Sequence, residues 1–306
     1  MNNFLSIYDL SRREIDTIFT QAARLKGHLQ KNELYLPLQG KTLGMIFDKA
    51  STRTRISFEV GMYQLGGLPI FLSGRDTQLG RGETIADTAR IMSRYLNGVV
   101  IRTYDHEIVE DFATHATVPV INGLTDLLHP CQILSDLFTL IEKRGGYEGM
   151  KVAYIGDGNN IANSWINAAV RLPFYLSLAC PEGYDPNQAI LQRGMDEAAG
   201  RIAVHRDPFA AAKNADVIYT DVWTSMGQEE ERDRRTKIFQ AFQVNQRLIA
   251  CARKEVIIMH CLPAHRGEEI TAEVIDGNHS VIIDQAENRL HVQKAILEIL
   301  LKDGGY

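Results

Sequence analysis

Short apolar runs alternate along the chain with longer segments in which apolar residues recur at helical spacing. Ser11 and Glu14 form a capping-box pattern that predicts the start of the first helix. A strand is predicted at Thr42–Phe47 and a helix at about Thr54–Leu65, and this alternation continues through the first half. Further strands are predicted at Leu68–Leu72, Gly98–Arg102 and Val118–Ile121, with helices near Thr84–Tyr95, Asp105–His115 and Cys131–Glu142. We expect these short strands to be buried in a parallel sheet.

A glycine-rich break at Arg144–Gly149 separates this series from a second one. The second series predicts strands near Lys151–Ile155, Tyr175–Ala179, Arg201–Val204, Val217–Thr220, Glu255–Met259 and Val281–Ile283. The last helix, about Asn288–Leu301, is apolar over much of its surface and is expected to bridge the domains. The predicted fold is therefore α/β, with two doubly wound parallel-sheet domains, residues 1–146 and 147–306, and the active site in the cleft between them.

Composition narrows the function classes. Of 306 residues, 45% are hydrophobic and 23% charged, as in ordinary globular proteins, and 33 basic against 38 acidic residues give a net charge of −5. This balance argues against a nucleic-acid partner. Without a long apolar run or a signal peptide, we expect no membrane association and a cytoplasmic location. The four cysteines are widely spaced, which predicts free thiols.

Polar side chains gather just beyond the predicted strand ends. Ser51-Thr52-Arg53-Thr54-Arg55 begins a helix, where free backbone N–H groups, hydroxyls and guanidiniums suit a small phosphate. Arg102 ends a strand, and Arg289 follows the last predicted one. A capped helix with solvated arginines, or a surface salt bridge, is the alternative for each motif taken alone.

His129 and Gln132 lie at another strand-to-helix junction, in His129-Pro130-Cys131-Gln132. Proline fixes the start of the helix and leaves both side chains able to donate to an oxygen. A lone histidine in that position is more often a cap or a packed side chain. The agreement with the other strand-end residues favours a site.

The turn at Ile155-Gly156-Asp157-Gly158-Asn159-Asn160 half-resembles a dinucleotide fingerprint, so an NAD-dependent oxidoreductase stays an alternative. The third glycine is replaced by Ile161, and two asparagines suit a polar small molecule better. We take Asn160 as the candidate ligand-binding residue.

Two more strand ends carry candidate residues. Asp221 precedes a long polar segment that contains Ser225 and Met226. The Asp221 carboxylate suits the ammonium group of an amino acid, and the segment suits its carboxylate. In His260-Cys261-Leu262-Pro263, Cys261 is a candidate nucleophile or substrate contact. Zinc spacing is missing, so no metal is expected, and a buried structural thiol is the alternative.

Together, the motifs Ser51–Arg55, His129–Gln132, Asp221 with Ser225-Met226-Gly227, and His260–Pro263 resemble the aspartate/ornithine carbamoyltransferase family over nearly the whole chain. The first two are shared by carbamoyltransferases in general, and the last two mark the ornithine branch. The resemblance implies transfer of a carbamoyl group from carbamoyl phosphate to L-ornithine without a cofactor. It leaves open whether the enzyme serves arginine biosynthesis or citrulline breakdown.

The resemblance also implies residue roles. Arg102, His129 and Cys261 are expected to be catalytic. The residues expected to bind carbamoyl phosphate are Ser51, Thr52, Arg53, Thr54, Gln78, Arg102, His129, Gln132, Cys261, Leu262 and Arg289. Those expected to bind ornithine are Asn160, Asp221, Ser225 and Met226. A homotrimer or a multiple of trimers is implied, with Gln78 reaching a neighbour's site.

Within the family, aspartate, putrescine or N-acetylornithine is an alternative acceptor. Aspartate would need cationic groups in place of the Ser225-Met226-Gly227 segment, and putrescine would need no carboxylate-binding amides. A catalytically silent relative is the alternative outside the enzymes.

Overall fold

The computed structural model describes residues 1–74, 82–224 and 231–302. The chain divides into two compact units, Met1–Phe138 with Glu287–Tyr306, and Thr139–Ala286. Each unit is built on a parallel sheet with helices on both faces, which confirms the predicted doubly wound α/β class.

The sheet of the first unit has four parallel strands in the order β2-β1-β3-β4. Its strands are β1 (Thr42–Phe47), β2 (Leu68–Ser73), β3 (Gly98–Arg102) and β4 (Val120–Leu124). Helices α2 (Arg53–Gln64), α3 (Ile85–Tyr95) and α4 (His106–His115) connect them in turn. The chain goes from β1 to the β2 side and then returns to the other side of β1, so the strand order reverses between β1 and β3.

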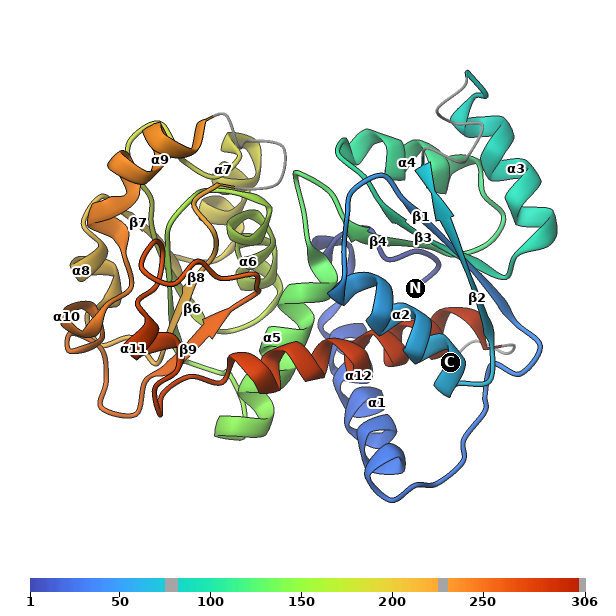
Figure 1. The fold of residues 1–306 in the computed structure, drawn as a ribbon, viewed down its shortest axis with the longest axis horizontal. Coiled ribbons are helices and arrows are strands. Elements are labelled where there is room, and N and C mark those ends of the chain that lie inside the picture. Colours follow the sequence, from blue (N-terminus) through green and yellow to red (C-terminus); the bar gives the residue numbers. More distant parts are fainter. Residues whose placement is uncertain (75–81, 225–230, 303–306) are drawn as a thin grey trace. The chain divides into compact units, whose positions relative to one another are not determined.

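Helices cover both faces of this sheet. Ile46, Val99 and Ile101 pack with α3 and α4 residues in one buried cluster. Figure 1 shows α3 and α4 on that side and α1 (Arg12–Gln30), α2 and the later part of α12 (Ile282–Leu301) on the other. The predicted capping box begins α1, since Ser11 and Glu14 exchange side-chain and backbone hydrogen bonds.

The second unit has a five-stranded parallel sheet in the order β7-β6-β5-β8-β9. Its strands are β5 (Lys151–Ile155), β6 (Tyr175–Ala179), β7 (Ile202–His205), β8 (Val217–Thr220) and β9 (Ile257–His260). The strand order reverses between β5 and β8. Ile155, Ile218 and Ile258 pack with helical residues such as Ala211 and Val274 on one face.

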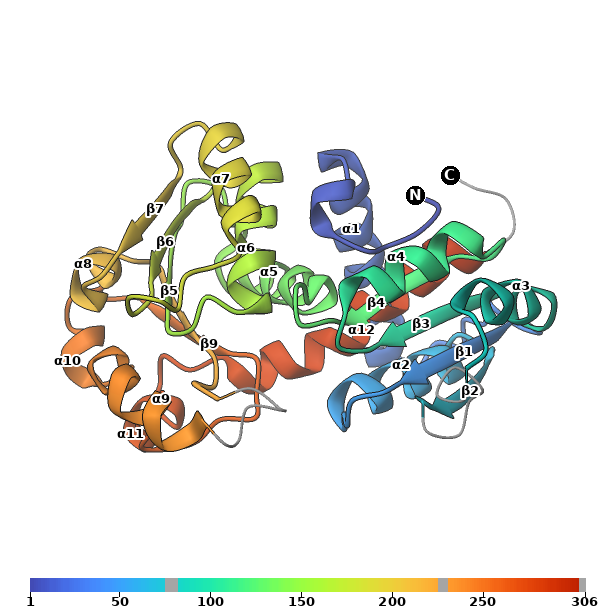
Figure 2. The same ribbon diagram turned by 90° about the horizontal axis from the view of Figure 1, so that it is seen from above.

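The helices of this unit lie on both sides of the sheet (Figure 2). They are α6 (Asn160–Arg171), α7 (Gln188–Glu197), α8 (Pro208–Ala212), α9 (Arg232–Phe239), α10 (Gln246–Ile249) and α11 (Ala272–Ile275). Trp165 of α6 packs edge-on against Phe174 and Tyr219, which ties this helix to the sheet. A rigid sheet covered on both faces can hold loop residues at its carboxyl edge.

Two predicted elements differ from the structure. The strand predicted at Val281–Ile283 is absent from the described residues, because α12 already begins at Ile282 and only Ser280 forms an isolated bridge, to Ile258. The prediction that β2 is buried is also wrong, since Leu68 is 60% exposed. β2 is the edge strand of its sheet, which explains its exposure.

The unit division does not fall in the glycine-rich break. It lies between Phe138 and Thr139, inside α5 (Pro130–Arg144), and α12 is likewise divided at Glu287. Assigning residues 1–146 and 147–306 to separate substrates stays a prediction.

Two simpler sequence features can be compared with the structure directly. All four cysteines are free thiols, as predicted. Cys131, Cys180 and Cys261 are buried, and Cys251 is half-buried. Among the described residues, no helix combines the length and apolarity that crossing a bilayer requires.

Candidate active site

The first polar cluster lies where the strand order of the four-stranded sheet reverses. Phe47 and Arg102, the last residues of β1 and β3, are partners in the ladder. The residues after β1 lead into the N-terminus of α2 at Arg53. In open α/β sheets, ligands bind at the carboxyl ends of the strands that flank such a reversal.

Two buried arginines converge there on one threonine hydroxyl. Arg102 Nη1 lies 3.3 Å from Thr54 Oγ1, and Arg289 Nη2 lies 2.6 Å from the same oxygen. Arg102 Nη2 also donates to the carbonyl of Ala50 at 3.3 Å, and the backbone N–H of Thr54 donates to Ser51 Oγ at 3.2 Å. Thr54, Arg102 and Arg289 are each at least 95% buried. The structure thus brings together residues from β1–α2, β3 and α12.

The electrostatics of this cluster favour an anion. Burial, together with the charges of Arg289 and Arg53, lowers the pKa of Arg102 to about 10, so the guanidinium is still charged at neutral pH. The buried Nε atoms of Arg53 and Arg102 have no hydrogen-bond partner among the described residues. Burying like charges together is costly, and a phosphate dianion would offset that cost.

Arg289 reaches the cluster differently from the prediction. The sequence placed it after a strand, whereas it lies in the third turn of α12. Arg55 does not join the cluster: its Nε pairs with Glu59 at 2.9 Å, and its guanidinium lies 3.6 Å from the centre of the Phe71 ring. Thr52 occupies the N-cap position of α2 without a side-chain capping bond.

His129 and Gln132 belong to the same unit, at the start of α5. Burial and the charges of Arg289, Arg102 and Arg53 hold the pKa of His129 well below its usual value, so its imidazole is neutral. Gln132 donates from Nε2 to Asp136 at 2.8 Å, and its buried Oε1 has no partner among the described residues. A neutral imidazole can donate one N–H to a carbonyl oxygen without adding charge.

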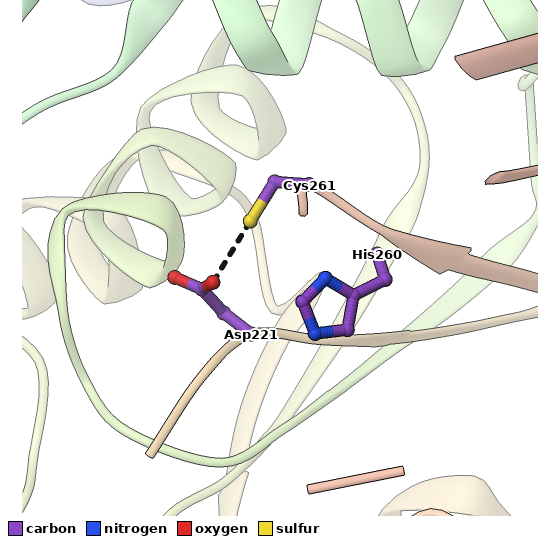
Figure 3. A group of neighbouring side chains, drawn as sticks. All are labelled: Asp221, His260 and Cys261. Atoms are coloured by element: carbon purple, nitrogen blue, oxygen red, sulfur yellow. Dashed lines mark hydrogen bonds between the residues drawn. The ribbon is translucent and has the colours of Figure 1, made fainter. Parts of the chain in front are cut away.

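The second cluster lies where the strand order of the five-stranded sheet reverses. Ile155 of β5 and Thr220 of β8 are ladder partners, and Asp221 comes next. The Asp221 carboxylate accepts hydrogen bonds from Cys261 Sγ and the Val222 backbone N–H on Oδ1, both at 2.8 Å, and from Asn159 Nδ2 on Oδ2 at 2.7 Å. Figure 3 shows the thiol of Cys261 directed at this carboxylate. Asp221 and Cys261 are both over 90% buried.

His260 supports the turn that carries Cys261 and Leu262. Its Nε2 lies 3.0 Å from Glu269 Oε1, and its Nδ1 accepts the backbone N–H of Leu262 at 2.8 Å. Asp221, His260 and Cys261 offer potential metal-ligand atoms within 4.8 Å of one another, as do His265, Glu268 and Glu269. Because both ring nitrogens of His260 already have protein partners, this histidine is poorly suited to ligate a metal.

The turn after β5 explains the partial dinucleotide pattern. Gly156 has a φ of 141°, which favours glycine. A Cβ on Gly158 would lie 2.2 Å from backbone atoms of Asp185 and Pro186, so this glycine allows close approach of the protein's own chain. Gly158 therefore allows close packing, as a glycine of the dinucleotide fingerprint does, but it packs against the protein's own backbone and not against a bound dinucleotide.

Sequence reasoning singled out Asn160, which is the first residue of α6, but it missed Asn159, which contacts Asp221 directly. The signal was an asparagine immediately before a helix, a typical N-cap.

Sequence reasoning also missed the buried pair of Asp157 and Arg235, in which Arg235 additionally donates to the carbonyl of Trp223. Burial raises the pKa of Asp157 to about 6, against the opposing effect of Arg235. Gln78, Ser225 and Met226 lie outside the described residues.

Comparison with known proteins finds family models that match the two regions of the chain in which these clusters lie. Residues 2–142 match the family model described as the carbamoyl-P binding domain of aspartate/ornithine carbamoyltransferase, and residues 148–300 match its Asp/Orn binding domain. The chain belongs to the aspartate/ornithine carbamoyltransferase family. The cationic cluster falls within the first matched region except for Arg289, and the Asp221–Cys261 cluster falls within the second.

Relatives within the aspartate/ornithine carbamoyltransferase family are similar over their full length. An ornithine carbamoyltransferase of Syntrophus aciditrophicus is 69% identical over 299 residues, covering 98% of this chain and 99% of the relative. One of Geobacter sulfurreducens is 52% identical, covering 99% and 100%. The solved structure of ornithine carbamoyltransferase from Pyrococcus furiosus superposes with a TM-score of 0.96 at 51% identity, covering 100% of this chain and 98% of that one.

Proposed function

We propose that this enzyme transfers the carbamoyl group of carbamoyl phosphate to the side-chain amine of L-ornithine, giving L-citrulline and phosphate. The observation that carries the proposal is the pair of polar clusters at the two strand-order reversals. One cluster is cationic and suits a phosphate, and the other joins a carboxylate to a thiol and suits an amine. The names of the full-length relatives support ornithine as the acceptor.

The phosphate is bound by the N-terminus of α2 and the surrounding side chains. Backbone N–H groups of a helix N-terminus are directed outward and carry partial positive charge. Ser51, Thr52, Arg53 and Thr54 belong to this segment, and Arg102 holds Thr54 from β3. As the bond from the carbamoyl carbon to the bridging oxygen breaks, this positive charge stabilises the departing phosphate.

The carbamoyl oxygen is polarised by His129, Gln132 and Arg289. When the amine attacks, negative charge develops on this oxygen in the tetrahedral intermediate. Neutral His129 donates an N–H, and Arg289 adds positive charge. Gln132 has a second Nε2 hydrogen available for this oxygen after donating the first to Asp136. Groups fixed before the reaction stabilise the intermediate without reorganising.

The ornithine amine is bound by Asp221, and Cys261 and Leu262 lie beside both the amine and the carbamoyl nitrogen. Free ornithine carries a protonated side-chain amine at neutral pH, and only the neutral amine attacks the carbamoyl carbon. Asp221 accepts a hydrogen bond from the amine and orients it, with Cys261 beside it. Asn160, Ser225 and Met226 bind the rest of the amino acid. The ammonium group loses one proton to solvent before the attack, and the proton lost by the attacking nitrogen afterwards leaves on the phosphate.

The decisive experiment is a colorimetric ureido assay with carbamoyl phosphate and four amines in parallel. We expect citrulline from L-ornithine and little or no product from putrescine, aspartate or N-acetylornithine. Release of phosphate, measured in the same reactions, should equal the citrulline formed. Absence of citrulline with ornithine would refute the proposal, and product with another amine alone would reassign the acceptor.

We further propose a homotrimer, or a multiple of trimers, in which Gln78 reaches a neighbour's site. An exposed apolar surface on the first unit supports this assembly. It consists of Ile56, Val60 and Tyr63 on α2 and Leu68 and Ile70 on the edge strand β2. We call it the α2–β2 surface. Exposed apolar edge strands are uncommon in monomers, because they promote association.

A further inference from the structure

Asn159 connects the cap of a helix to the carboxylate of the amine site. Its Oδ1 accepts the backbone N–H groups of Ile161 and Ala162, at 3.0 and 3.4 Å, and so caps α6. The same oxygen accepts the hydroxyl of Tyr154 at 3.1 Å. Its Nδ2 donates to Asp221 Oδ2 at 2.7 Å. One side chain therefore performs two tasks: its carbonyl oxygen caps α6, and its N–H₂ group holds Asp221.

We infer that Asn159 is a positioning residue that fixes the orientation and charge of the Asp221 carboxylate for binding of the substrate amine. This inference rests on the proposed function, in which Asp221 orients the ornithine amine. Asn159 acts through Asp221, and it has no required contact with the substrate.

The hydrogen bonds to Asp221 determine which oxygen is available. A carboxylate oxygen accepts about two hydrogen bonds. Oδ1 already accepts two, from Val222 and Cys261, whereas Oδ2 accepts one among the described residues, from Asn159. With the carboxylate held from both ends, one acceptor position on Oδ2 is left for the amine. Rotation of the carboxylate would lose all three bonds.

The orientation of the Asn159 amide follows from its neighbours. The groups that approach Oδ1 are two backbone N–H donors and a phenol, so this atom must be the carbonyl oxygen. Tyr154 keeps its proton, since burial and the Asp221 charge raise its pKa well above the usual range. The Tyr154 hydroxyl lies 2.7 Å from the Asp157 carbonyl, another acceptor. The amide is therefore fixed with its N–H₂ facing Asp221.

Other titratable groups near Asp221 are accounted for. Cys261 donates its thiol proton to Asp221. His260, from β9, uses both nitrogens with Glu269 and Leu262. The Asp157 carboxyl pairs with Arg235 of α9. Asn159 is the uncharged side-chain donor to Asp221 Oδ2, as the Cys261 thiol is to Oδ1, and replacing the Asn159 amide by a carboxylate changes the charge that Asp221 faces.

The substitution Asn159→Asp separates the two tasks. Aspartate caps helices as well as asparagine does, so the start of α6 is preserved. A second carboxylate then faces Asp221 Oδ2, and the pair shares a proton, which raises the apparent pKa of the site. A proton on the shared position blocks the acceptor that the amine needs. We expect kcat/KM for ornithine to fall at least tenfold at pH 7.5. The acidic limb of its pH profile should shift to higher pH by about one unit or more.

Asn187 provides a matched control. It caps α7 in the same way, with Oδ1 accepting the backbone N–H groups of Ala189 and Ile190 at 3.1 and 3.2 Å, and it faces solvent rather than Asp221. Asn187→Asp should leave kcat/KM and its pH profile within about twofold of wild type. Asn159→Ser keeps a capping hydroxyl and adds no charge, so it should lower kcat/KM for ornithine without the shift in pH profile.

The measurements are steady-state kinetics with ornithine from pH 6.5 to 9.5, and calorimetric titration with carbamoyl phosphate alone. The carbamoyl phosphate affinity should stay within about twofold of wild type in all variants, because the residues proposed to bind its phosphate group belong to the other cluster. A wild-type pH profile in Asn159→Asp, or an equal loss in Asn187→Asp, would overturn the inference. If the wild type forms no citrulline, the proposed function fails instead, and the two failures are distinguished.

Discussion

At the scale of single residues, the partner of each guanidinium decides which arginines can serve the site. Arg102 is buried and donates to the Thr54 hydroxyl, whereas Arg55 is exposed and paired with Glu59. We expect Arg102→Ala to lower kcat about a hundredfold or more, the usual cost of removing a fixed donor to developing charge. Steady-state assays with saturating ornithine measure this.

The matched control for that substitution is Arg55→Ala, which removes a nearby arginine of the Ser51–Arg55 motif that does not join the cluster. Its ion pair with Glu59 is exposed, and such pairs contribute little to stability. We expect turnover within about twofold of wild type. Equal losses in the two variants would show that these arginines act through their total charge, and normal turnover in Arg102→Ala would remove Arg102 from the mechanism.

His129 gives a prediction of pH dependence. Its pKa is lowered well below the usual 6.5 by burial and by Arg289, Arg102 and Arg53, so the unfolded chain takes up a proton before the folded one does. The free energy of unfolding therefore falls as pH drops below about 6.5, by at most about 1.4 kcal/mol per pH unit from this residue. In His129→Gln this contribution disappears.

Urea unfolding of the wild type and His129→Gln at pH 7.5 and 5.5 tests the sign. The stability of the wild type relative to the variant should decrease from pH 7.5 to 5.5. A histidine-resolved NMR titration provides the direct measurement, with the His129 signal unchanged between these values. A transition near pH 6.5 in that signal would contradict the neutral imidazole.

Sequence patterns predicted site residues where a single strand end places them. Asp221 and Arg102 were chosen as candidates in this way, since both directly end or follow a buried apolar run. Asn159 was missed in favour of Asn160, because the side chain that reaches Asp221 depends on the cap geometry of α6. Arg235 was missed because it pairs with Asp157, which lies 78 residues away in sequence. Such contacts depend on tertiary packing.

At the scale of elements, the turn between β5 and α6 depends on Gly158. Its added Cβ would approach the Asp185–Pro186 backbone to 2.2 Å, and backbone atoms cannot yield as a flexible side chain does. We expect Gly158→Ala to destabilise the protein by about 1–3 kcal/mol, as overpacking does, and to raise the KM for ornithine by displacing Asn159. Urea unfolding and steady-state kinetics measure the two effects.

Gly27 provides the opposite case in the same protein. It lies inside α1, and a Cβ there would meet nothing within 4 Å. Gly27→Ala should therefore stabilise the protein by about 0.5–1 kcal/mol, because alanine loses less backbone entropy in a helix. Its kinetics should match the wild type. Stabilisation by both substitutions would show that the turn relaxes around Gly158.

Elements with strong periodicity were predicted closely, and the exceptions have physical causes. β1, β5, β6 and β8 have the predicted bounds, because each is a short apolar run followed by polar residues, glycine or, after β6, Cys180-Pro181. Val281–Ile283 is equally apolar, but Ile282 and Ile283 are the first residues of α12. A short apolar run fits a strand or a buried helical turn, and tertiary context selects between them.

At the scale of the whole molecule, sequence alternation predicted two parallel-sheet units, and the division of the chain by contacts differs from the predicted boundary. The glycine-rich break at Gly145-Gly146 ends α5, whereas contacts divide the chain within that helix and again within α12. Contact density depends on what each helical turn packs against, and composition does not report it. Arg289 illustrates the consequence, because a residue late in the sequence completes the cluster built by the first unit.

The α2–β2 surface leads to a prediction of assembly. Tyr63 and Leu68 are 75% and 60% exposed, so changing them should affect folding by about 0.5 kcal/mol or less. We expect the wild type to sediment at about three times 34.4 kDa or a multiple of that mass, and Tyr63→Asp with Leu68→Asp to dissociate it, because unpaired carboxylates would be buried at the contact. Activity should fall with dissociation, since the proposed trimer supplies Gln78 across the contact.

Met195→Glu is the control for added surface charge. Met195 is 47% exposed on α7, which belongs to the second unit, whereas the α2–β2 surface belongs to the first. This variant should keep both the mass and the activity of the wild type. Sedimentation velocity at micromolar concentration gives the mass, and activity measured on the same samples shows whether the two change together. A wild type of 34.4 kDa with full activity would refute the trimer, and a dissociated variant with full activity would remove Gln78 from the neighbour's site.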